Sequence, residues 1–424
     1  MTPLSAPIPL RNSSVWAGYR EAVAIPHRYG SASGSLIQYN ATRTQFVWCD
    51  HAAQSIDTVL VGGQSVGDWV WRNTVDSTGH TVTMVEFGQP QDEGATLFAR
   101  GRGKRHPADG RAMTNPADVI WDVLANLAGR DITSTQLTEF RNECVREGVE
   151  VGGSIDSEDS VQSVVRAICA SVGAIYCADM PGLCKLWPGV STPSPRITIK
   201  ESPLTAGAAM DRITTELTIR FAHEGRQPRG SVRMDAPDAV ARLGLRSDTI
   251  DAPWITSYRV AVAVGKRLLQ QRARKQWAIQ FKSTRALSVG DGVTLSHPMS
   301  PATGTHMVLS RETNLDTGAG SASVLVPVGD APVVRLVNQS SAFDPAQYAN
   351  AIVTNAGADR ILTLVEQDGR PIANAAVTLD GGIVRYTDSA GRVSFPVSSM
   401  PAGEHVLAIL TEDGRTLTMT VLIT

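Results

Sequence analysis

The chain has 424 residues, which is too many for one compact core, so we expect about three domains. Hydrophobic residues make up 42% and charged residues 19%, as in ordinary globular proteins, and the many Gly, Thr, Ser and Val residues favour β structure. The formal net charge of −2 would not attract a polyanion, so nucleic-acid binding could come only from local basic patches. These values exclude a mainly disordered chain and do not suit a dedicated DNA-binding protein.

The first residues have neither a charged start nor an unbroken apolar segment, so we expect no secretory signal. No window approaches the roughly 18 to 20 apolar residues that span a bilayer. We therefore expect a soluble protein made in a cytosol. Residues 1–20 are rich in Pro and Ser and show no periodicity, which indicates an N-terminal arm.

Short strands separated by turn residues predict a first β-barrel domain over residues 21–112. The expected strands cover residues 35–39, 44–49, 57–61, 69–72 and 81–87, with turn signals at 62–63 and 77–79. This spacing is typical of a small antiparallel barrel or sandwich. The basic stretch 100–106 is interpreted as a flexible loop at the end of this domain.

Three helices and a hairpin are predicted next. Asn115 can cap a first helix, Pro116 suits its first turn and Gly129 suits its end. A second helix is expected over residues 135–147, and a third directly after Ser157, where two acidic residues would favour the helix dipole. Residues 174–177 and 183–187 form the predicted hairpin, with a loop over 179–182.

The five cysteines are Cys49, Cys144, Cys169, Cys177 and Cys184. Their odd number argues against a disulfide framework. The predicted hairpin sets Cys177 opposite Cys184, so a reduced cross-strand pair is the simplest interpretation. A zinc or iron–sulfur site formed by Cys144, Cys169, Cys177 and Cys184, or a disulfide among them, stays open as an alternative.

A second β-barrel is predicted to be discontinuous in sequence. Residues 214–220 alternate as a strand, but strands resume only at Trp277, after a long helix over residues 258–276. We pair the first strand with those at 277–281, 292–296, 307–310 and 324–328. This gives a second barrel from about 201–225 plus 277–339, and a mixed α/β domain from 113–200 plus about 226–276.

The last domain is predicted to be an immunoglobulin-like β-sandwich over residues 359–424, after a linker at 340–358. Its alternating strands are expected at 361–365, 376–379, 384–387, 393–395, 405–410 and 417–423. The turns at 369–375 and 387–391 resemble those of the carboxypeptidase-regulatory and bacterial immunoglobulin-like families. The last lysine is Lys282, so this domain cannot form an internal Lys–Asn cross-link.

Candidate catalytic residues are few. Ser65 lies in a Gly-x-Ser-x-Gly pattern, but a strand follows it where a hydrolase nucleophile needs a helix, so we expect a hairpin turn. His297 and His306 lie near Asp291, and turn chemistry explains them better than a metal does. We predict no catalytic, cofactor-binding or metal-ligating residue, no cofactor, and therefore no enzyme.

Two basic tracts are prominent: residues 100–106, and the acid-free stretch between Asp251 and Asp291. Its basic residues are Arg259, Lys266, Arg267, Arg272, Arg274, Lys275, Lys282 and Arg285. Neither tract interleaves aromatic residues as a base-stacking surface would. We expect both to face an acidic surface of a neighbouring subunit or solvent.

The order of this basic helix, the strand from Trp277, the Gly-Asp-Gly turn at 290–292 and His297-Pro298 resembles the second barrel of bacteriophage tail hub proteins. With the preceding barrel and helical insert, the resemblance covers about residues 22–337. It implies a mainly β, α+β structural protein of the virion, assembled in the host cytoplasm. Three copies would form a pseudo-sixfold ring at the tip of the tail, in its baseplate.

The same resemblance implies the partners. One face of the ring would bind the six-fold tail tube or distal tail protein, and the other a threefold tip, fibre or tape-measure protein, while DNA passes without being recognised. Exposed aromatic residues such as Trp69 and Trp71 would contribute to the interfaces. Two alternatives remain: a surface or carbohydrate-binding adhesion module built on the terminal sandwich, and a tail-associated hydrolase that uses Ser65.

Overall fold

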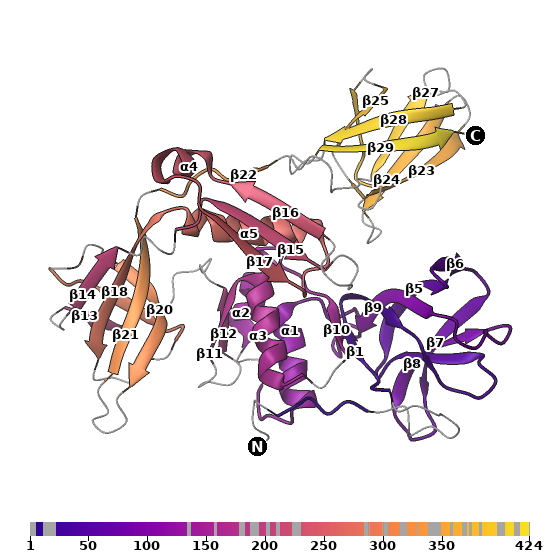
Figure 1. The fold of residues 1–424 in the computed structure, drawn as a ribbon, viewed down its shortest axis with the longest axis horizontal. Helices are drawn as coiled ribbons and strands as arrows, with labels where there is room; N and C mark the ends of the chain where they lie inside the picture. Colours follow the sequence, from indigo (N-terminus) through magenta and orange to yellow (C-terminus); the bar gives the residue numbers. More distant parts are fainter. Residues whose placement is uncertain are drawn as a thin grey trace. The chain divides into compact units, whose positions relative to one another are not determined.

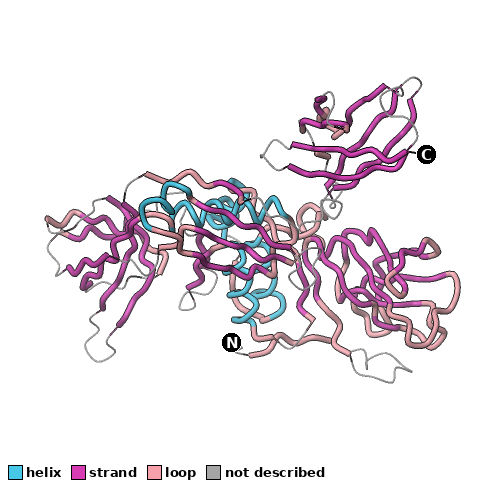
Figure 2. Tube along the Cα trace, turned by 45° about the horizontal axis from the view of Figure 1, so that its top comes forward, coloured by secondary structure: helices cyan, strands magenta, loops and turns pink. Residues whose placement is uncertain are grey.

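The chain forms two compact units in a computed structural model, residues 1–337 and 338–424 (Figure 1). The structure describes residues 6–11, 23–133, 137–156, 159–177, 183–186, 195–200, 204–208, 213–222, 230–283, 287, 289–298, 300, 304–313, 320–328, 330–337, 349–356, 359–366, 371–372, 375–380, 384–396, 403–410 and 416–423. Helices occur in the first unit, whereas the described part of the second is strand and turn (Figure 2). The chain is therefore mainly β, as predicted. None of the described helices is long and apolar enough to cross a bilayer.

Two four-stranded sheets form the first β region. Their orders are β2-β9-β5-β6 and β3-β4-β8-β7. The strands are β2 (Ser31–Ser35), β3 (Ile37–Gln38), β4 (Gln45–Cys49), β5 (Ala53–Val61), β6 (Gln64–Val66), β7 (Trp69–Val75), β8 (Thr81–Phe87) and β9 (Leu97–Lys104). Phe46, Trp48, Ile56 and Val85 belong to one buried cluster shared by both sheets. Val47, Val82 and Met84 form a second cluster, because alternate residues of a strand point to opposite faces.

The prediction of a loop at residues 100–106 is wrong over most of its length. Residues 100–104 continue strand β9, which lies between β2 and β5. Gly101 and Gly103 suggested a flexible segment, but a Cβ on Gly101 would lie 2.2 Å from the Ser55 carbonyl oxygen, and one on Gly103 would lie 2.2 Å from that of Arg28. These glycines allow close backbone approach inside a sheet.

The described part of the N-terminal arm packs against the first unit. Pro7 forms an isolated bridge with Ser160, and the backbone N–H of Ile8 donates to the Asp159 carbonyl at 2.9 Å. The Ile8 side chain is 1% exposed. Residues 6–11 are therefore not a detached tail, and residues 1–5 and 12–20 lie outside the described residues.

The predicted helices are present, with shifted ends. Helix α1 (Pro116–Trp121) continues as the π-helical η2 (Asp122–Leu127), and the Asn115 side chain accepts from the Ala117 N–H at 2.9 Å. Helix α2 is Thr138–Arg146 and helix α3 is Val161–Val172. The third helix begins after Ser160, not after Ser157, because the chain at Asp159 and Ser160 is extended and pairs with residues 7 and 8.

The predicted hairpin forms, but its register differs by one residue. Strand β11 (Ala174–Cys177) pairs with β12 (Leu183–Leu186) so that Tyr176 lies opposite Cys184 and Cys177 lies opposite Leu183. The two cysteines are therefore not directly cross-strand. A shift of one residue reverses which side chains share a face, so the sequence could not fix this register without the loop geometry. The loop at 178–182 lies outside the described residues.

A central sheet of order β17-β15-β16-β22 contradicts the predicted partners of residues 214–220. Its strands are β15 (Glu216–Phe221), β16 (Gly230–Asp235), β17 (Ser247–Ala252) and β22 (Arg335–Leu336), and two helices, α4 (Pro237–Leu243) and α5 (Tyr258–Arg272), accompany it. The pattern predicted the strand correctly, but alternation cannot select a partner. Partner choice follows from α5, which packs so closely that a Cβ on Gly265 would lie 1.9 Å from Met234 Cε of β16.

The second β region is one six-stranded sheet of order β13-β19-β20-β21-β18-β14. Its strands are β13 (Pro195–Ile199), β14 (Leu204–Ala208), β18 (Lys275–Ser283), β19 (Gly292–Leu295), β20 (Gly304–Thr313) and β21 (Gly320–Val328). Apolar residues of all six strands meet in one cluster that includes Ile199, Ala206, Phe281 and Val308. Because β18 begins at Lys275, the long helix ends at Arg272 and not at residue 276. Strands β15 and β22 do not belong to this sheet.

The small sheet of β1 (His27–Tyr29) and β10 (Gly153–Ile155) links the first β region to the helical region.

In the second unit, two sheets share one apolar core that contains Leu362, Val377 and Phe395. Their orders are β23-β24-β27 and β26-β25-β28-β29. The strands are β23 (Ala349–Ala356), β24 (Asp359–Glu366), β25 (Ala376–Leu379), β26 (Val384–Tyr386), β27 (Arg392–Pro396), β28 (Gly403–Leu410) and β29 (Thr416–Ile423).

The second unit is thus a sandwich of two sheets, and the predicted linker was too long. Residues 349–356, assigned to the linker, form strand β23 and pair along their full length with β24. The segment is polar and small, so its sequence resembles a linker, but its backbone completes a sheet. The immunoglobulin-like topology stays a prediction.

Candidate functional site

Ser65 does not lie in the setting that a hydrolase nucleophile needs. It is an exposed residue of β6, which forms a hairpin with β5 and places Ser65 opposite Leu60. Gly62 and Gly63 make the turn with φ of 58° and 87°. A nucleophile of this motif would sit between a strand and a helix, so the pattern is explained by the hairpin.

The histidines near the second β region do not assemble a metal site. His306 belongs to β20 and pairs with Val293, while His297 follows the end of β19. Within the described ranges, no group of three or more His, Cys, Asp and Glu residues could hold a metal ion. The alternative of a metal bound by the cysteines therefore has no support from the described side chains, although the side chain of Cys177 is outside them.

A close pair, Cys49 and His51, superficially resembles a catalytic dyad in the first β region. Cys49 Sγ lies 3.6 Å from His51 Nδ1, and both residues are buried. Burial raises the pKa of Cys49 to about 12, so its thiol stays protonated. His51 Nε2 accepts the backbone N–H of Arg28 at 2.9 Å, which places the ring proton on Nδ1. The pair is therefore a packing contact with no reactive thiolate.

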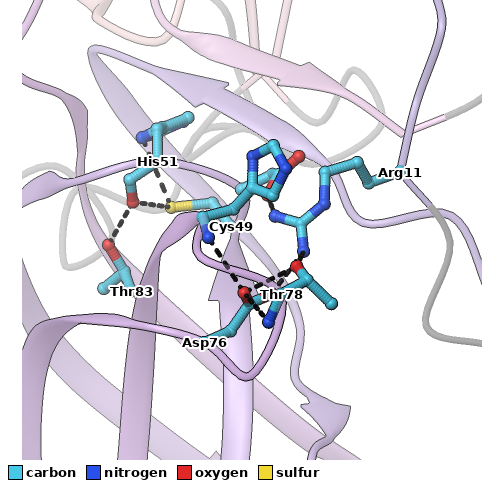
Figure 3. A network of polar contacts seen from close by, with 8 residues as sticks. Arg11, Cys49, His51, Asp76, Thr78 and Thr83 are labelled. Atoms are coloured by element: carbon cyan, nitrogen blue, oxygen red, sulfur yellow. Dashed lines mark hydrogen bonds and ion pairs between the residues drawn. The ribbon is translucent and has the colours of Figure 1, made fainter. Parts of the chain in front are cut away.

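The N-terminal segment is held by a polar network around Arg11 (Figure 3). Its guanidinium makes ion pairs with Asp50 and Asp76 and donates to Thr78 Oγ1 at 3.0 Å. Asp76 in turn accepts from the backbone N–H of Thr78 at 2.9 Å and from that of His80 at 3.0 Å. The network attaches the chain before β1 to the tight turn between β7 and β8, so it shapes this part of the surface.

A second polar network is buried where the first β region meets the helices. Asp122, which is fully buried at the start of η2, accepts from Tyr29 Oη at 2.7 Å, from Lys104 Nζ at 2.7 Å and from Asn126 Nδ2 at 2.6 Å. Burial, and then the nearby Asp122 carboxylate, raise the pKa of Tyr29 well above its usual value. We call this network of Tyr29, Lys104, Asp122 and Asn126 the seam of the first unit. It links β1, β9 and η2.

Two buried histidines and a buried arginine extend the seam. The rings of His27 and His51 stack with centroids 5.9 Å apart. Burial, supported by the charge of Lys104, lowers the pKa of His27 to about 4, and burial lowers that of His51 well below its usual value. Arg28 donates to the carbonyl oxygens of Trp48 and Ser33 at 2.8 and 2.7 Å. Both histidines are therefore neutral in the folded protein at pH 7.

The basic tracts do not form one charged surface. Arg267 of α5 is buried and donates to the Val172 carbonyl, and Arg272 pairs with Asp248 at 2.7 Å. Lys104 of the other tract pairs with buried Asp122. The interpretation that both tracts face solvent or an acidic neighbour is therefore wrong for Arg267 and Lys104, whereas Arg272 is partly exposed and pairs with an acidic residue of its own chain. Arg285 lies outside the described residues.

The predicted interface aromatics are partly buried in their own domain. Trp69 and Trp71 pack against the first cluster, and Trp69 Nε1 donates to the Val66 carbonyl at 2.7 Å. The exposed apolar residues of the same strand are Val70 and Val75, each 63% exposed. Alternation along β7 could have predicted the outward side of Val70, which lies between the two tryptophans in sequence, but not that of Val75, which is in phase with them.

No family model and no curated protein matches the chain. Over about three quarters of its length the chain is similar in structure to tail proteins of phages and prophages. A tail protein of Neisseria meningitidis MC58 aligns with 13% identity over 72% of this chain and 93% of its own, at a TM-score of 0.31.

The prophage MuSo2 43 kDa tail protein of Shewanella oneidensis aligns with 13% identity over 75% of this chain and 97% of its own, at 0.32. Prophage tail protein gp18 of Listeria monocytogenes aligns with 10% identity over 73% and 91%, at 0.29. TM-scores this low carry no argument about function, so the function has to be argued from the chain's own residues.

Proposed function

We propose that this chain is a structural protein of a phage tail, a trimeric hub at the distal end that joins the tail tube or distal tail protein to a threefold tip or fibre. The observation that carries the proposal is the arrangement of residues 23–337: two β regions, each with its own apolar core, flank one helical region. This is the order that the resemblance to hub proteins requires.

The free edge of β7 supports the proposed contact between copies. Among the described strands, β7 pairs only with β8, so its outer edge presents unpaired backbone groups. Such an edge can add a strand from a neighbour, and the exposed Val70 and Val75 would then lose contact with water. In a ring of three copies every copy uses the same pair of surfaces, and growth ends because the rotation closes after the third copy.

Light scattering on the full chain tests the proposal. A hub should form a species of about three times the monomer mass of 45.2 kDa, alone or after a tail-tube partner is added. Val70→Lys and Val75→Lys should reduce that species to monomer, whereas Val333→Lys, at a valine that is 71% exposed, should not. A chain that stays monomeric with its tube partner, with no rings in electron micrographs, contradicts the hub.

A surface-binding role for the second unit is the second candidate. Val384, Tyr386 and Val406 are 49%, 70% and 46% exposed on strands β26 and β28 of one sheet. An exposed aromatic residue on a flat sheet suits stacking against a sugar ring. Binding of the full chain to host cells or their polysaccharide, lost with Tyr386→Ala and kept with Val333→Lys, would favour this role over a purely structural one.

A further inference from the structure

We propose that Cys169 and Cys184 are a disulfide-forming site, in which oxidation joins helix α3 to strand β12. The two Sγ atoms lie 3.8 Å apart, and each residue is 2% exposed. A disulfide needs the sulfurs at about 2.05 Å, so they must approach by under about 2 Å. The thiols already touch, and only a small movement separates them from a bond.

The hairpin of β11 and β12 is suited to make that movement. Within the described residues it is a sheet of two strands with no third strand. Polar contacts join β12 to α2: the Leu186 N–H donates to Glu143 Oε2 at 3.1 Å, and Lys185 Nζ lies 3.3 Å from Glu139 Oε2. An isolated hairpin shifts more easily than a strand inside a larger sheet, because fewer ladder hydrogen bonds must move with it.

The other cysteines fit less well. Cys177 lies opposite Leu183, one register position from Cys184. Cys144 is fully buried on α2, and burial raises the pKa of its thiol well above the usual value, which disfavours the reactive thiolate. Cys49 lies in the first β region beside His51. The contact between Cys169 Sγ and Cys184 Sγ at 3.8 Å therefore favours this pair.

The reaction is thiol–disulfide exchange with a small-molecule disulfide such as oxidised glutathione. One cysteine thiolate attacks a sulfur of the small disulfide, whose S–S bond breaks and releases one thiolate that takes up a proton. The second cysteine then attacks the mixed disulfide and releases the other half. Two protein thiols are oxidised, and one small disulfide is reduced to two thiols. Local opening of the hairpin admits the reagent.

The bond itself does not depend on the proposed function, but its timing does. A chain that folds in a reducing cytosol and then leaves the cell in a virion would meet an oxidising medium only after assembly. Oxidation would then link the hairpin covalently to α3 in the finished particle. The bond would stabilise the first unit because it restricts the unfolded chain between residues 169 and 184.

The test uses the full chain with and without oxidised glutathione. Denatured protein should contain five reactive thiols before treatment and three afterwards, since one bond consumes two. Peptide mapping should find the linked peptides of Cys169 and Cys184. The melting temperature of the first unit should rise by about 4 °C, and dithiothreitol should reverse the rise.

Variants separate this bond from the alternatives. Cys169→Ser and Cys184→Ser should abolish the oxidant-dependent rise, whereas Cys177→Ser should keep it. A link between Cys177 and Cys184 or between Cys144 and Cys169, glutathione adducts without a link, or five remaining thiols would each overturn the proposal. Peptide mapping of the oxidised chain without substitutions does not depend on the folding of any variant. Its result is also independent of whether the chain forms trimers.

Discussion

The first β region and the terminal sandwich have similar strands but different interiors. Charged and polar groups, including Arg28, His51 and the Asp122 carboxylate of η2, are buried where the first region meets the helices. The described core of the terminal sandwich is a cluster of ten apolar residues from both sheets, and the buried polar residues in the described part of this unit are Thr387 and His405. A buried charge is tolerable only while its partners stay in place. The first region therefore depends on the helical region, whereas the sandwich depends on its own packing.

We expect the largest loss of stability when the seam of the first unit is broken. Asp122→Ala removes the acceptor of Tyr29, Lys104 and Asn126 and leaves the Lys104 charge without its buried partner. The free energy of unfolding of the first unit should fall by about 3–5 kcal/mol. Chemical denaturation should show this loss with the transition of the second unit unchanged. Asp57→Ala, at an exposed carboxylate, should cost under about 0.5 kcal/mol.

The matching change in the sandwich is Phe395→Ala. Phe395 is 2% exposed, and the Arg385 guanidinium lies 5.7 Å from its ring centroid. The cavity and the lost contact should cost the second unit about 3–5 kcal/mol and leave the first unit intact. Tyr386→Ala in the other sheet of the sandwich serves as the control, because Tyr386 is exposed. Loss of both transitions together would contradict the independence of the two units.

The next largest effect is the loss of stability that we expect for the first unit in acid. The pKa of His27 is lowered from 6.5 to about 4 in the folded protein, so between these values the unfolded chain binds more protons. The contribution of His27 is complete above pH 6.5 and falls by about 3 kcal/mol as the pH drops to 4. His27→Gln should flatten the pH dependence of the first unit's stability over this range.

The smallest effect concerns a helix cap. Asn115→Ala removes the acceptor for the Ala117 N–H and should destabilise the first unit by about 1 kcal/mol. Asn115→Ser should restore most of that loss, because serine also accepts at this position. Equal losses for both variants would show that the side chain acts through its other contact, in which Asn115 Nδ2 donates to the Arg141 carbonyl at 3.2 Å.

Local sequence patterns were sufficient to predict many of the helices and strands. Asn115 and Pro116 predicted the start of α1, and alternation predicted the strands at residues 81–87 and 376–379, because capping and side-chain period depend on near neighbours. Gly101 and Gly103 led to the wrong prediction of a loop. They allow neighbouring backbone to approach closely, and the sequence alone does not show which segment lies opposite them.

Strand partners and buried charges follow from tertiary contacts. Residues 216–221 read as a strand in either sheet, and packing of α5 through Gly265 assigns them to the central one. Arg267 and Lys104 belong to basic tracts, yet one lies buried against Val172 and the other pairs with Asp122. Pairing and burial depend on residues far apart in the chain, so the period and charge of a segment leave them open.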